Sequence, residues 1–444
     1  MSSAVTTVSV PASPAQQRLW FIDRLDKSAG LAYHLYCSVR LTGDLDVAAL
    51  RKALDTVVER HEVLRAHFVE QQGTAVMVIR PPEAFTLRTS DSSDEAQVGS
   101  DAAAEGQAAF DLATGPLIRG RLLRIDPRHH VLTITMHHIV SDGWSVGILI
   151  REAAALYAAA RAGQANPLPP LRSQYRHYVQ QQSERLTGAV LNGQMTYWRE
   201  QLRGAPGLLE LPLDRRRPAL QSYRGAAREW RIEAALCMSL RKLARQYGLT
   251  LYMVLYAGWA ITLSRLSGQN EVVIGAPVAN RHSTDAEQMI GLFVNTLALR
   301  ADLRGAPSIA ELLARIKAMT LAAWSHQDIA FEQVVELLQP PRTLGHNPIF
   351  QVLFVLQNTP HSGSRLAELQ ITPMALPTVT AQFDLSLSLQ EVGTEIQGGL
   401  AYATDLFDPD TIERWLGYLT RVFTAMVRDP GQRVEEVDLA ECVA

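Results

Sequence analysis

Cysteine is scarce in this sequence, which holds three cysteines among 444 residues. Cys37, Cys237 and Cys442 lie far apart and do not form the paired spacing of a metal or redox motif. Such sparse cysteine is typical of a protein kept in a reducing compartment. The sequence therefore predicts no metal site and indicates a cytoplasmic protein.

Neither sign of charge dominates, and no apolar run is long. Lys and Arg total 42 against 45 Asp and Glu, a net charge of -3, so no basic field favours nucleic acid. The opening MSSAVTTVSVPAS lacks the charged start and apolar stretch of a signal peptide. Residues 251–263 form the longest apolar stretch, too short for a bilayer span of roughly 20 residues. We expect a buried core helix there, and neither nucleic acid nor membrane as a partner.

Apolar residues are plentiful, at 47% of the chain, which is enough for two substantial lobes. Residues 163–170 (GQANPLPP) have the composition of a linker. We therefore predict an N-terminal lobe over residues 1–170, and bridging helices followed by a C-terminal lobe over residues 171–444.

Hydrophobic periodicity and capping residues place the expected elements. Ser13, Pro14 and Gln16 together predict a capped helix start. Residues 89–105, rich in Ser, Asp and Ala, predict a loop leading into a short helix. Helices are predicted at 13–25, 46–59, 145–162, 173–184, 188–202, 235–247, from 250, at 308–324 and at 409–428. Strands are predicted at 35–41, within 66–80 as a pair, and at 117–124, 131–139, 226–232, 271–277, 351–356 and 385–390.

The segment 131–145 (VLTITMHHIVSDGWS) is the best candidate for chemistry. An apolar strand ends in His137 and His138, and Asp142 and Gly143 follow just before a helix. Adjacent side chains on a strand point to opposite faces, so the two histidines are not expected to share one task. A structural interpretation is also open, because strand-end histidines are often only hydrogen-bonded and Asp is a common helix cap.

The H-H-x-x-x-D-G spacing resembles the active-site pattern of nonribosomal peptide synthetase condensation domains, which belong to the chloramphenicol acetyltransferase-like superfamily. Further segments resemble that family's motifs in the family's order. They are residues 13–21 (SPAQQRLWF), 60–65 (RHEVLR), 175–178 (YRHY), 290–296 (IGLFVNT), 326–332 (HQDIAFE) and 347–352 (NPIFQV). In one of them His177 stands where the family usually has Asp, which leaves its local role open.

The resemblance implies a mixed α/β fold of two chloramphenicol acetyltransferase-like lobes in a V shape around a tunnel. It implies amide formation between a donor acyl or peptidyl thioester and the amine of an aminoacyl thioester. Donor and acceptor carrier proteins would present both substrates on phosphopantetheine arms, or acyl-CoA would serve as donor. The domain itself would bind no cofactor, and an adenylation domain would adjoin it in the full synthetase.

The resemblance also suggests roles for single residues. His138 is the candidate general base or amine-orienting group, since histidine titrates near neutral pH. Gly143, at a helix start, is a candidate oxyanion donor through its backbone N–H, or else has only a conformational role. His137 and Asp142 are expected to support the site. A buried Asp needs a partner, and Arg281 is our prediction for it.

Other assignments use the same residues. An epimerization domain shares the His pair and the fold, and a docking module for carrier proteins shares the fold without catalysis. His137 and Asp142 also fit the H-x-x-x-x-D spacing of glycerolipid acyltransferases. Within the condensation family, the position of the first motif at Ser13 permits a starter domain, which acylates the first amino acid. It also permits a domain excised from a longer synthetase, or one supplied by a separate protein. The end of the chain, without adenylation or carrier motifs, is expected to mark a fragment of a larger synthetase.

Overall fold

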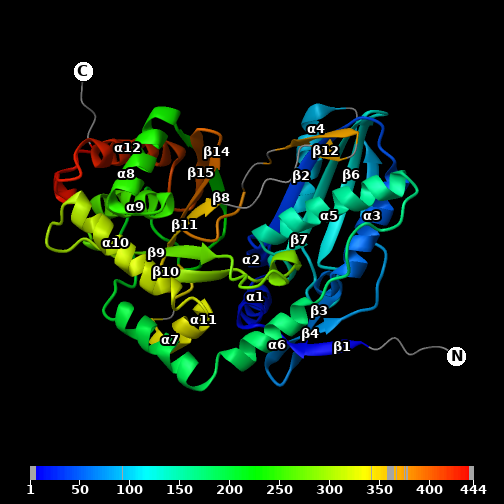
Figure 1. The fold of residues 1–444 in the computed structure, drawn as a ribbon, viewed down its shortest axis with the longest axis horizontal. Helices are drawn as coiled ribbons and strands as arrows, with labels where there is room; N and C mark the ends of the chain where they lie inside the picture. The colour runs from blue at the N-terminus through cyan, green and yellow to red at the C-terminus, as the bar shows by residue number, and fades with distance from the viewer. Residues whose placement is uncertain are drawn as a thin grey trace. The chain divides into compact units, whose positions relative to one another are not determined.

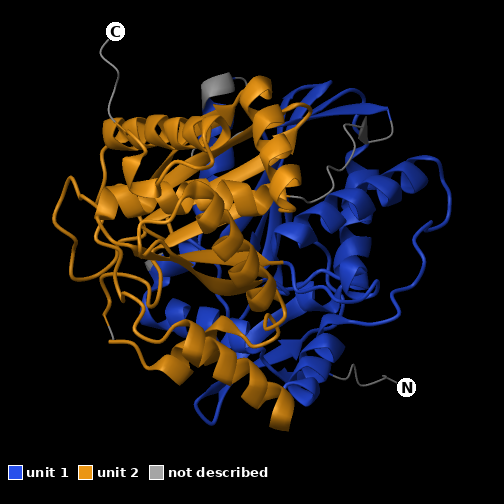
Figure 2. Ribbon diagram, turned by 60° about the vertical axis from the view of Figure 1, so that its left-hand side comes forward, with its two compact units in different colours: residues 1–187, 279–294, 359–377 blue, residues 188–278, 295–358, 378–444 orange. Residues whose placement is uncertain are grey.

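The computed structural model forms two compact units (Figure 2). It describes residues 7–92, 94–341, 343–357, 365–366, 368–374, 376 and 379–439, so Cys442 lies outside the described residues. Unit 1 consists of residues 1–187, 279–294 and 359–377, and unit 2 consists of residues 188–278, 295–358 and 378–444. Three segments that the predicted boundary at residue 170 placed in the second lobe, 171–187, 279–294 and 359–377, thus belong to unit 1.

Unit 1 contains a six-stranded sheet in the order β12-β13-β2-β7-β6-β5 (Figure 1). It also contains a three-stranded sheet in the order β1-β4-β3. Its strands are β1 (Val8–Pro11), β2 (His34–Thr42), β3 (Ala66–Gln71), β4 (Thr74–Ile79), β5 (Leu87–Asp91), β6 (Ile118–Asp126), β7 (His129–His137), β12 (Arg365–Leu366) and β13 (Leu369–Pro373). Its helices are α1 (Pro14–Leu25), α2 (Lys27–Leu31), α3 (Val47–Arg60), α4 (Glu95–Gln107), α5 (Gly143–Arg161) and α6 (Tyr175–Arg185), with 3₁₀ turns η1 (Glu62–Arg65), η2 (His138–Val140) and η3 (Ala286–Gln288).

Strand β7 lies inside the six-stranded sheet and carries the candidate site at its end. It pairs antiparallel with β2, where His34 lies opposite His137, and with β6, where Ile118 lies opposite Met136. All of its residues except the first are buried, as expected for a central strand covered on both faces. Neighbours on both sides therefore fix where β7 ends, and with it the position of the histidine pair.

Of the loop and short helix predicted over residues 89–105, the helix is confirmed and the loop at its start is wrong. Residues 87–91 form β5, an edge strand that pairs parallel with β6, and α4 already begins at Glu95. Only Leu87 of β5 is buried, so its sequence shows no alternation, and pairing with β6 determines the strand instead. Helix α4 buries Val98 and Ala102, four residues apart, as a narrow apolar stripe. Because the stripe is so narrow, the sequence of this helix resembles that of a polar loop.

Unit 2 contains a second six-stranded sheet, in the order β10-β9-β11-β14-β15-β8. Its strands are β8 (Gly225–Ile232), β9 (Glu271–Val278), β10 (Asn295–Asp302), β11 (Val352–Gln357), β14 (Leu385–Val392) and β15 (Glu395–Ala403). Its helices are α7 (Gly188–Gln201), α8 (Ala234–Tyr247), α9 (Leu251–Ser267), α10 (Ile309–Trp324), α11 (Phe331–Leu338) and α12 (Pro409–Arg428), with the 3₁₀ turn η4 (Val434–Glu436). The remaining predicted helices and strands match elements of the two units within a few residues. The elements α2, α11, β1, β10, β12, β13 and β15 were not predicted.

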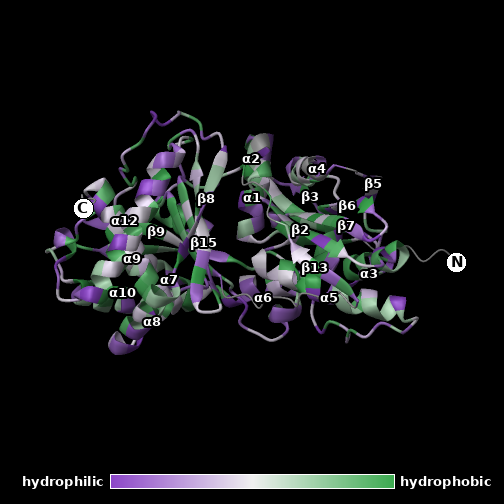
Figure 3. Cartoon of the chain, turned by 90° about the horizontal axis from the view of Figure 1, so that it is seen from above, coloured by the Kyte–Doolittle hydropathy of each residue, from purple (hydrophilic) through white to green (hydrophobic). Residues whose placement is uncertain are grey.

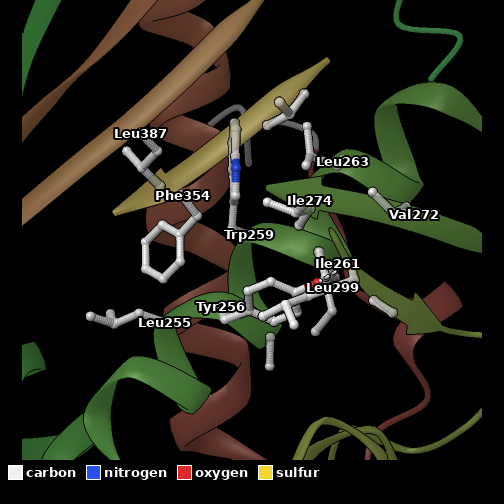
Figure 4. Close-up of a cluster of buried hydrophobic side chains, with 14 of the residues drawn as sticks. Leu255, Tyr256, Trp259, Ile261, Leu263, Val272, Ile274, Leu299, Phe354 and Leu387 are labelled. Atoms are coloured by element: carbon white, nitrogen blue, oxygen red, sulfur yellow. Dashed lines mark hydrogen bonds between the residues drawn. The ribbon is translucent and has the colours of Figure 1, made fainter. Parts of the chain in front are cut away.

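The apolar stretch 251–263 forms the core helix that the sequence predicts. Every residue of α9 from 253 to 264 is buried, and Figure 4 shows Tyr256 and Trp259 beside Phe354 of β11. A Cβ atom on Gly258 would lie 2.2 Å from the Phe423 ring of α12, so close helix packing requires glycine there. By contrast α12 is amphipathic, and Figure 3 shows hydrophilic and hydrophobic residues alternating along it.

Among the described helices, no single one is long and apolar enough to cross a membrane. Helices α8 and α9 satisfy the length and composition criteria only as a pair, and they are bent by 105° at their junction. The complete burial of the middle of α9 is typical of a core helix.

Candidate active site

The His pair lies where β7 gives way to a turn. His137 is the last residue of the strand, and His138 opens the 3₁₀ turn η2. The His138 N–H donates to the Tyr33 carbonyl at 2.8 Å, and the Gln16 side-chain nitrogen donates to the Ile139 carbonyl at 2.9 Å. Helix α1 therefore holds the turn through the same glutamine that caps the helix start.

His137 is a buried part of the fold, with 1% of its surface exposed. Its Nδ1 accepts a hydrogen bond from the Ile139 N–H at 3.1 Å. Burial lowers the pKa of His137 well below its usual value, so the ring is neutral. The supporting role expected for His137 stays a prediction.

His138 is half-buried, in contrast to its neighbour. Burial lowers the pKa of His138 below its usual value, and the nearby charge of Asp142 opposes that shift. The ring is therefore neutral near pH 7 and able to accept a proton. Its Nδ1 has no hydrogen-bond partner among the described residues.

Asp142 is the cap of α5 and the partner of Arg281. Its Oδ1 accepts from the Ser145 N–H at 2.9 Å and from Arg281 Nη2 at 2.9 Å, and its Oδ2 accepts from the Phe293 N–H at 3.0 Å. The Asp142 and Arg281 side chains are only 3% and 2% exposed. The predicted Asp142–Arg281 pair is confirmed as a buried ion pair.

Ser145 is a site residue that the sequence analysis missed. Its hydroxyl lies 2.7 Å from Asp142 Oδ1, 3.1 Å from the Gly291 carbonyl and 3.0 Å from Arg281 Nη2, and it accepts from the Gly291 N–H at 3.1 Å. Its position three residues after Asp142 is a capping signal, but no local pattern indicates the bonds to Gly291. A Cβ atom at 291 would lie 2.2 Å from the Tyr175 ring, so the close approach of that ring requires glycine.

Gly143 is exposed at the first position of α5. Its φ angle is not positive, and a Cβ atom built on it would meet nothing within 4 Å. Neither backbone strain nor packing within the described residues therefore explains a glycine here. Gly143 opens α5, and positive charge accumulates at the start of a helix.

The other motif residues serve the fold. His61 Nε2 lies 2.8 Å from the buried Glu152, and His61 Nδ1 accepts from the Ile290 N–H at 3.3 Å. His177 Nδ1 accepts from the Gln174 N–H at 3.3 Å, which shows how an imidazole replaces the usual Asp as a cap partner. Asn295 bonds two backbone carbonyls of the segment before α11. Within the described part of the chain, no three His, Cys, Asp or Glu side chains are grouped to hold a metal ion.

Several known proteins are similar to this chain in sequence and in fold. A model of the condensation domain family matches residues 7–442. Malpinin synthetase of Mortierella alpina is 45% identical over 98% of the chain, and a linear gramicidin synthase of Brevibacillus parabrevis is 39% identical over 97%. The chain covers only 6% of each of these synthetases. The crystal structure of the X-domain from teicoplanin biosynthesis superimposes with a TM-score of 0.91 at 31% identity, covering 98% of this chain and 99% of that one.

The chain therefore belongs to the condensation domain family of nonribosomal peptide synthetases, which are amide-forming acyltransferases of secondary metabolism. The predicted fold class, mixed α/β with chloramphenicol acetyltransferase-like lobes, is confirmed. The V-shaped arrangement and its tunnel stay predictions.

Replacing Arg281 by methionine should destabilise unit 1 strongly. The change leaves the Asp142 carboxylate buried without its counter-charge, which costs about 3–5 kcal/mol. Arg161→Met is the control, because Arg161 pairs at 3.0 Å with Asp44, a side chain that is 90% exposed, and should cost no more than about 1 kcal/mol. Urea unfolding of both variants measures the difference, and equal losses would contradict the structural weight given to this pair.

Proposed function

We propose that this chain joins a donor acyl or peptidyl thioester to the amine of an aminoacyl thioester held on an acceptor carrier protein. The observation that supports it is the neutral, half-buried His138 five residues before Gly143, which opens a helix capped by Asp142 of the buried Asp142–Arg281 pair. Aminolysis of a thioester needs a proton acceptor for the amine and a donor for the oxyanion, and this site can supply both.

His138 acts on the amine in this proposal. The attacking nitrogen becomes cationic as it adds to the thioester carbonyl, and a neutral imidazole accepts its proton or orients it. The lowered pKa of His138 keeps the imidazole in its accepting form at neutral pH. The thiol of the donor arm then leaves as the tetrahedral intermediate collapses to the amide.

Gly143 stabilises the oxyanion through its backbone N–H. At the first position of α5 this N–H has no carbonyl within the helix to bond. The absence of a side chain, with open space around the Cα atom, lets a substrate carbonyl approach the backbone closely.

Carrier proteins are the partners that we propose for both substrates, each delivered on a phosphopantetheine arm. Holding two tethered reactants in line can lower the barrier by about 7–11 kcal/mol, so the site needs no bound cofactor of its own. An adjoining adenylation domain would load the acceptor, and the reaction would take place in the cytoplasm. The chain's 6% share of its synthetase relatives leaves ample sequence in those proteins for such domains.

His138→Ala should slow amide formation by about 10²–10⁴-fold if His138 is a general base. His129→Ala, at the half-exposed start of β7, serves as the control and should keep full activity. The measurement is single-turnover amide formation with carrier-bound substrates. A loss smaller than about tenfold for His138→Ala would exclude the general-base role and leave only orientation.

Gly143→Pro tests the oxyanion donor because it deletes one N–H group. Proline suits the first position of a helix, and the preceding Asp142 already has extended backbone angles, so α5 should form normally. We expect a loss of about 10²–10³-fold in the rate of amide formation. Gly143→Ala adds bulk in the same place but keeps the N–H, and if it loses as much as the proline variant, the N–H is not the important group.

The donor class can be identified by mass spectrometry of the product. The domain is incubated with one aminoacyl-carrier acceptor and a panel of acyl-CoA, acyl-carrier and peptidyl-carrier donors. We expect an amide from the panel, with turnover of acyl-CoA if the chain is a starter domain. A product from peptidyl donors alone would exclude the starter assignment, and no product from any donor would favour the docking module.

A further inference from the structure

Three aromatic rings meet edge to face beneath the candidate site. The rings of His34 on β2 and His137 on β7 have centroids 5.7 Å apart, and Phe110 contacts both, at 5.0 Å from His34 and 6.2 Å from His137. The interplanar angles of 72–90° are those of T-shaped contacts. We call His34, Phe110 and His137 the ring cluster.

Arg119 stacks on the Phe110 ring of the cluster. Its guanidinium lies 3.9 Å from the centroid of the Phe110 ring. Glu105 fixes that guanidinium at 2.5 Å, and the Glu105 and Ala108 carbonyls accept further hydrogen bonds from it. His34 is fixed as well, because its Nδ1 lies 2.8 Å from the Gly106 carbonyl. Every neighbour of His137 in the cluster is therefore itself held in place.

The hydrogen bonds determine the proton positions on His137. A backbone N–H can only donate, so the His137 Nδ1 that receives the Ile139 N–H must be bare. The neutral ring then carries its proton on Nε2, which is buried and has no hydrogen-bond partner among the described residues. An unsatisfied buried N–H costs about 1–3 kcal/mol. The structure tolerates this cost in order to keep Nδ1 available to Ile139.

We propose that His34, Phe110 and Arg119 are positioning residues, which keep His137 dry and in one tautomer so that its bond to Ile139 holds the His138 turn. The inference rests on the proposed role of His138, although its first measurement does not. If His137 gained a proton, Nδ1 would become a donor facing the Ile139 donor. The bond would break, and the turn that carries His138 would lose one of the three hydrogen bonds described for it.

Several charged or titratable groups face His137 from the packed elements. Burial is the largest cause of the lowered pKa of His137, and a charge on His34 of β2, on His138 of the turn or on Lys27 of α2 opposes a positive charge on His137 as well. Arg119 is separated from His137 by the Phe110 ring and adds to the positive surroundings of His34. The cluster thus disfavours protonation of His137 mainly by burying it, and the charge of Lys27 adds to that effect.

The test compares two phenylalanine-to-leucine variants in unit 1. Phe110→Leu removes the ring that contacts His137. Phe85→Leu is the control, because the Phe85 ring packs on Gly120 of β6. Gly120 follows Arg119 directly in that strand, so the two residues face opposite sides of the sheet. Both phenylalanines are 7% exposed, so the general loss of packing is matched. Nitrogen-15 NMR of the imidazoles then reports the tautomer and the pKa of His137 in each variant, without any substrate.

We expect wild type and Phe85→Leu to show a neutral His137 protonated on Nε2 throughout the measured pH range. In Phe110→Leu, entry of water should mix the tautomers and raise the pKa of His137 toward about 6.5. With carrier-bound substrates, kcat of Phe110→Leu should fall by up to about 10²-fold with KM unchanged. The acid limb of its pH profile should also move to higher pH, because the protonated His137 is inactive.

An unchanged His137 tautomer and pKa in Phe110→Leu would overturn the proposal, and so would equal kcat losses in the two variants. If wild type forms no amide at all, the proposed function fails while the NMR comparison still decides the role of the cluster. Should Phe110→Leu not fold, His34→Asn carries the same expectations. It removes a ring but keeps an amide nitrogen where His34 Nδ1 meets the Gly106 carbonyl.

Discussion

The buried carboxylate of Asp142 is the constraint on which the candidate site depends. A carboxylate that is 3% exposed must be surrounded by donors and a counter-charge, and it draws them from distant parts of the chain. The start of α5 supplies the Ser145 N–H, and the segment 279–294 supplies Arg281 and the Phe293 N–H. The charge of Asp142 therefore determines both where α5 begins and where the segment 279–294 lies. Gly143 follows Asp142 directly, as the first residue of α5.

Four histidines of unit 1 are neutral, and one of them responds to this charge. His34, His61, His137 and His138 all have lowered pKa values, with burial as the largest cause in each case. Only for His138 does the Asp142 charge act against burial. Asp142 supports protonation of His138, as Glu152 does for His61, whereas His137 is a fixed acceptor for a backbone N–H.

Local signals predicted the parts of the site that depend on neighbours in sequence. Asp142 as a cap, Ser13 and Gln16 as a capping box, and β7 as an apolar strand were all visible, and the need of a buried Asp for a cation led to Arg281. The second task of Gln16 at Ile139, the bonds of Ser145 to Gly291 and the contacts of Phe110 join residues far apart in the chain. No periodicity encodes such contacts. Strand β5 was missed for the same reason, since its partner β6 and not its own pattern determines it.

The segment 279–294 shows how much of the fold is arranged for the site. Strands β9 and β10 are antiparallel neighbours, with Val278 opposite Asn295, so a two-residue turn could join them. Sixteen residues intervene instead and belong to unit 1. Such a long excursion costs loop-closure and ordering entropy, and unit 2 gains no strand pairing from it. The segment supplies contacts to the site instead. Arg281 and the Phe293 N–H bind Asp142, and the Gly291 N–H donates to Ser145. The Ile290 N–H donates to His61. Neither sheet needs the segment 279–294 for its stability. The buried carboxylate of Asp142 needs it, because the segment supplies Arg281 and the Phe293 N–H.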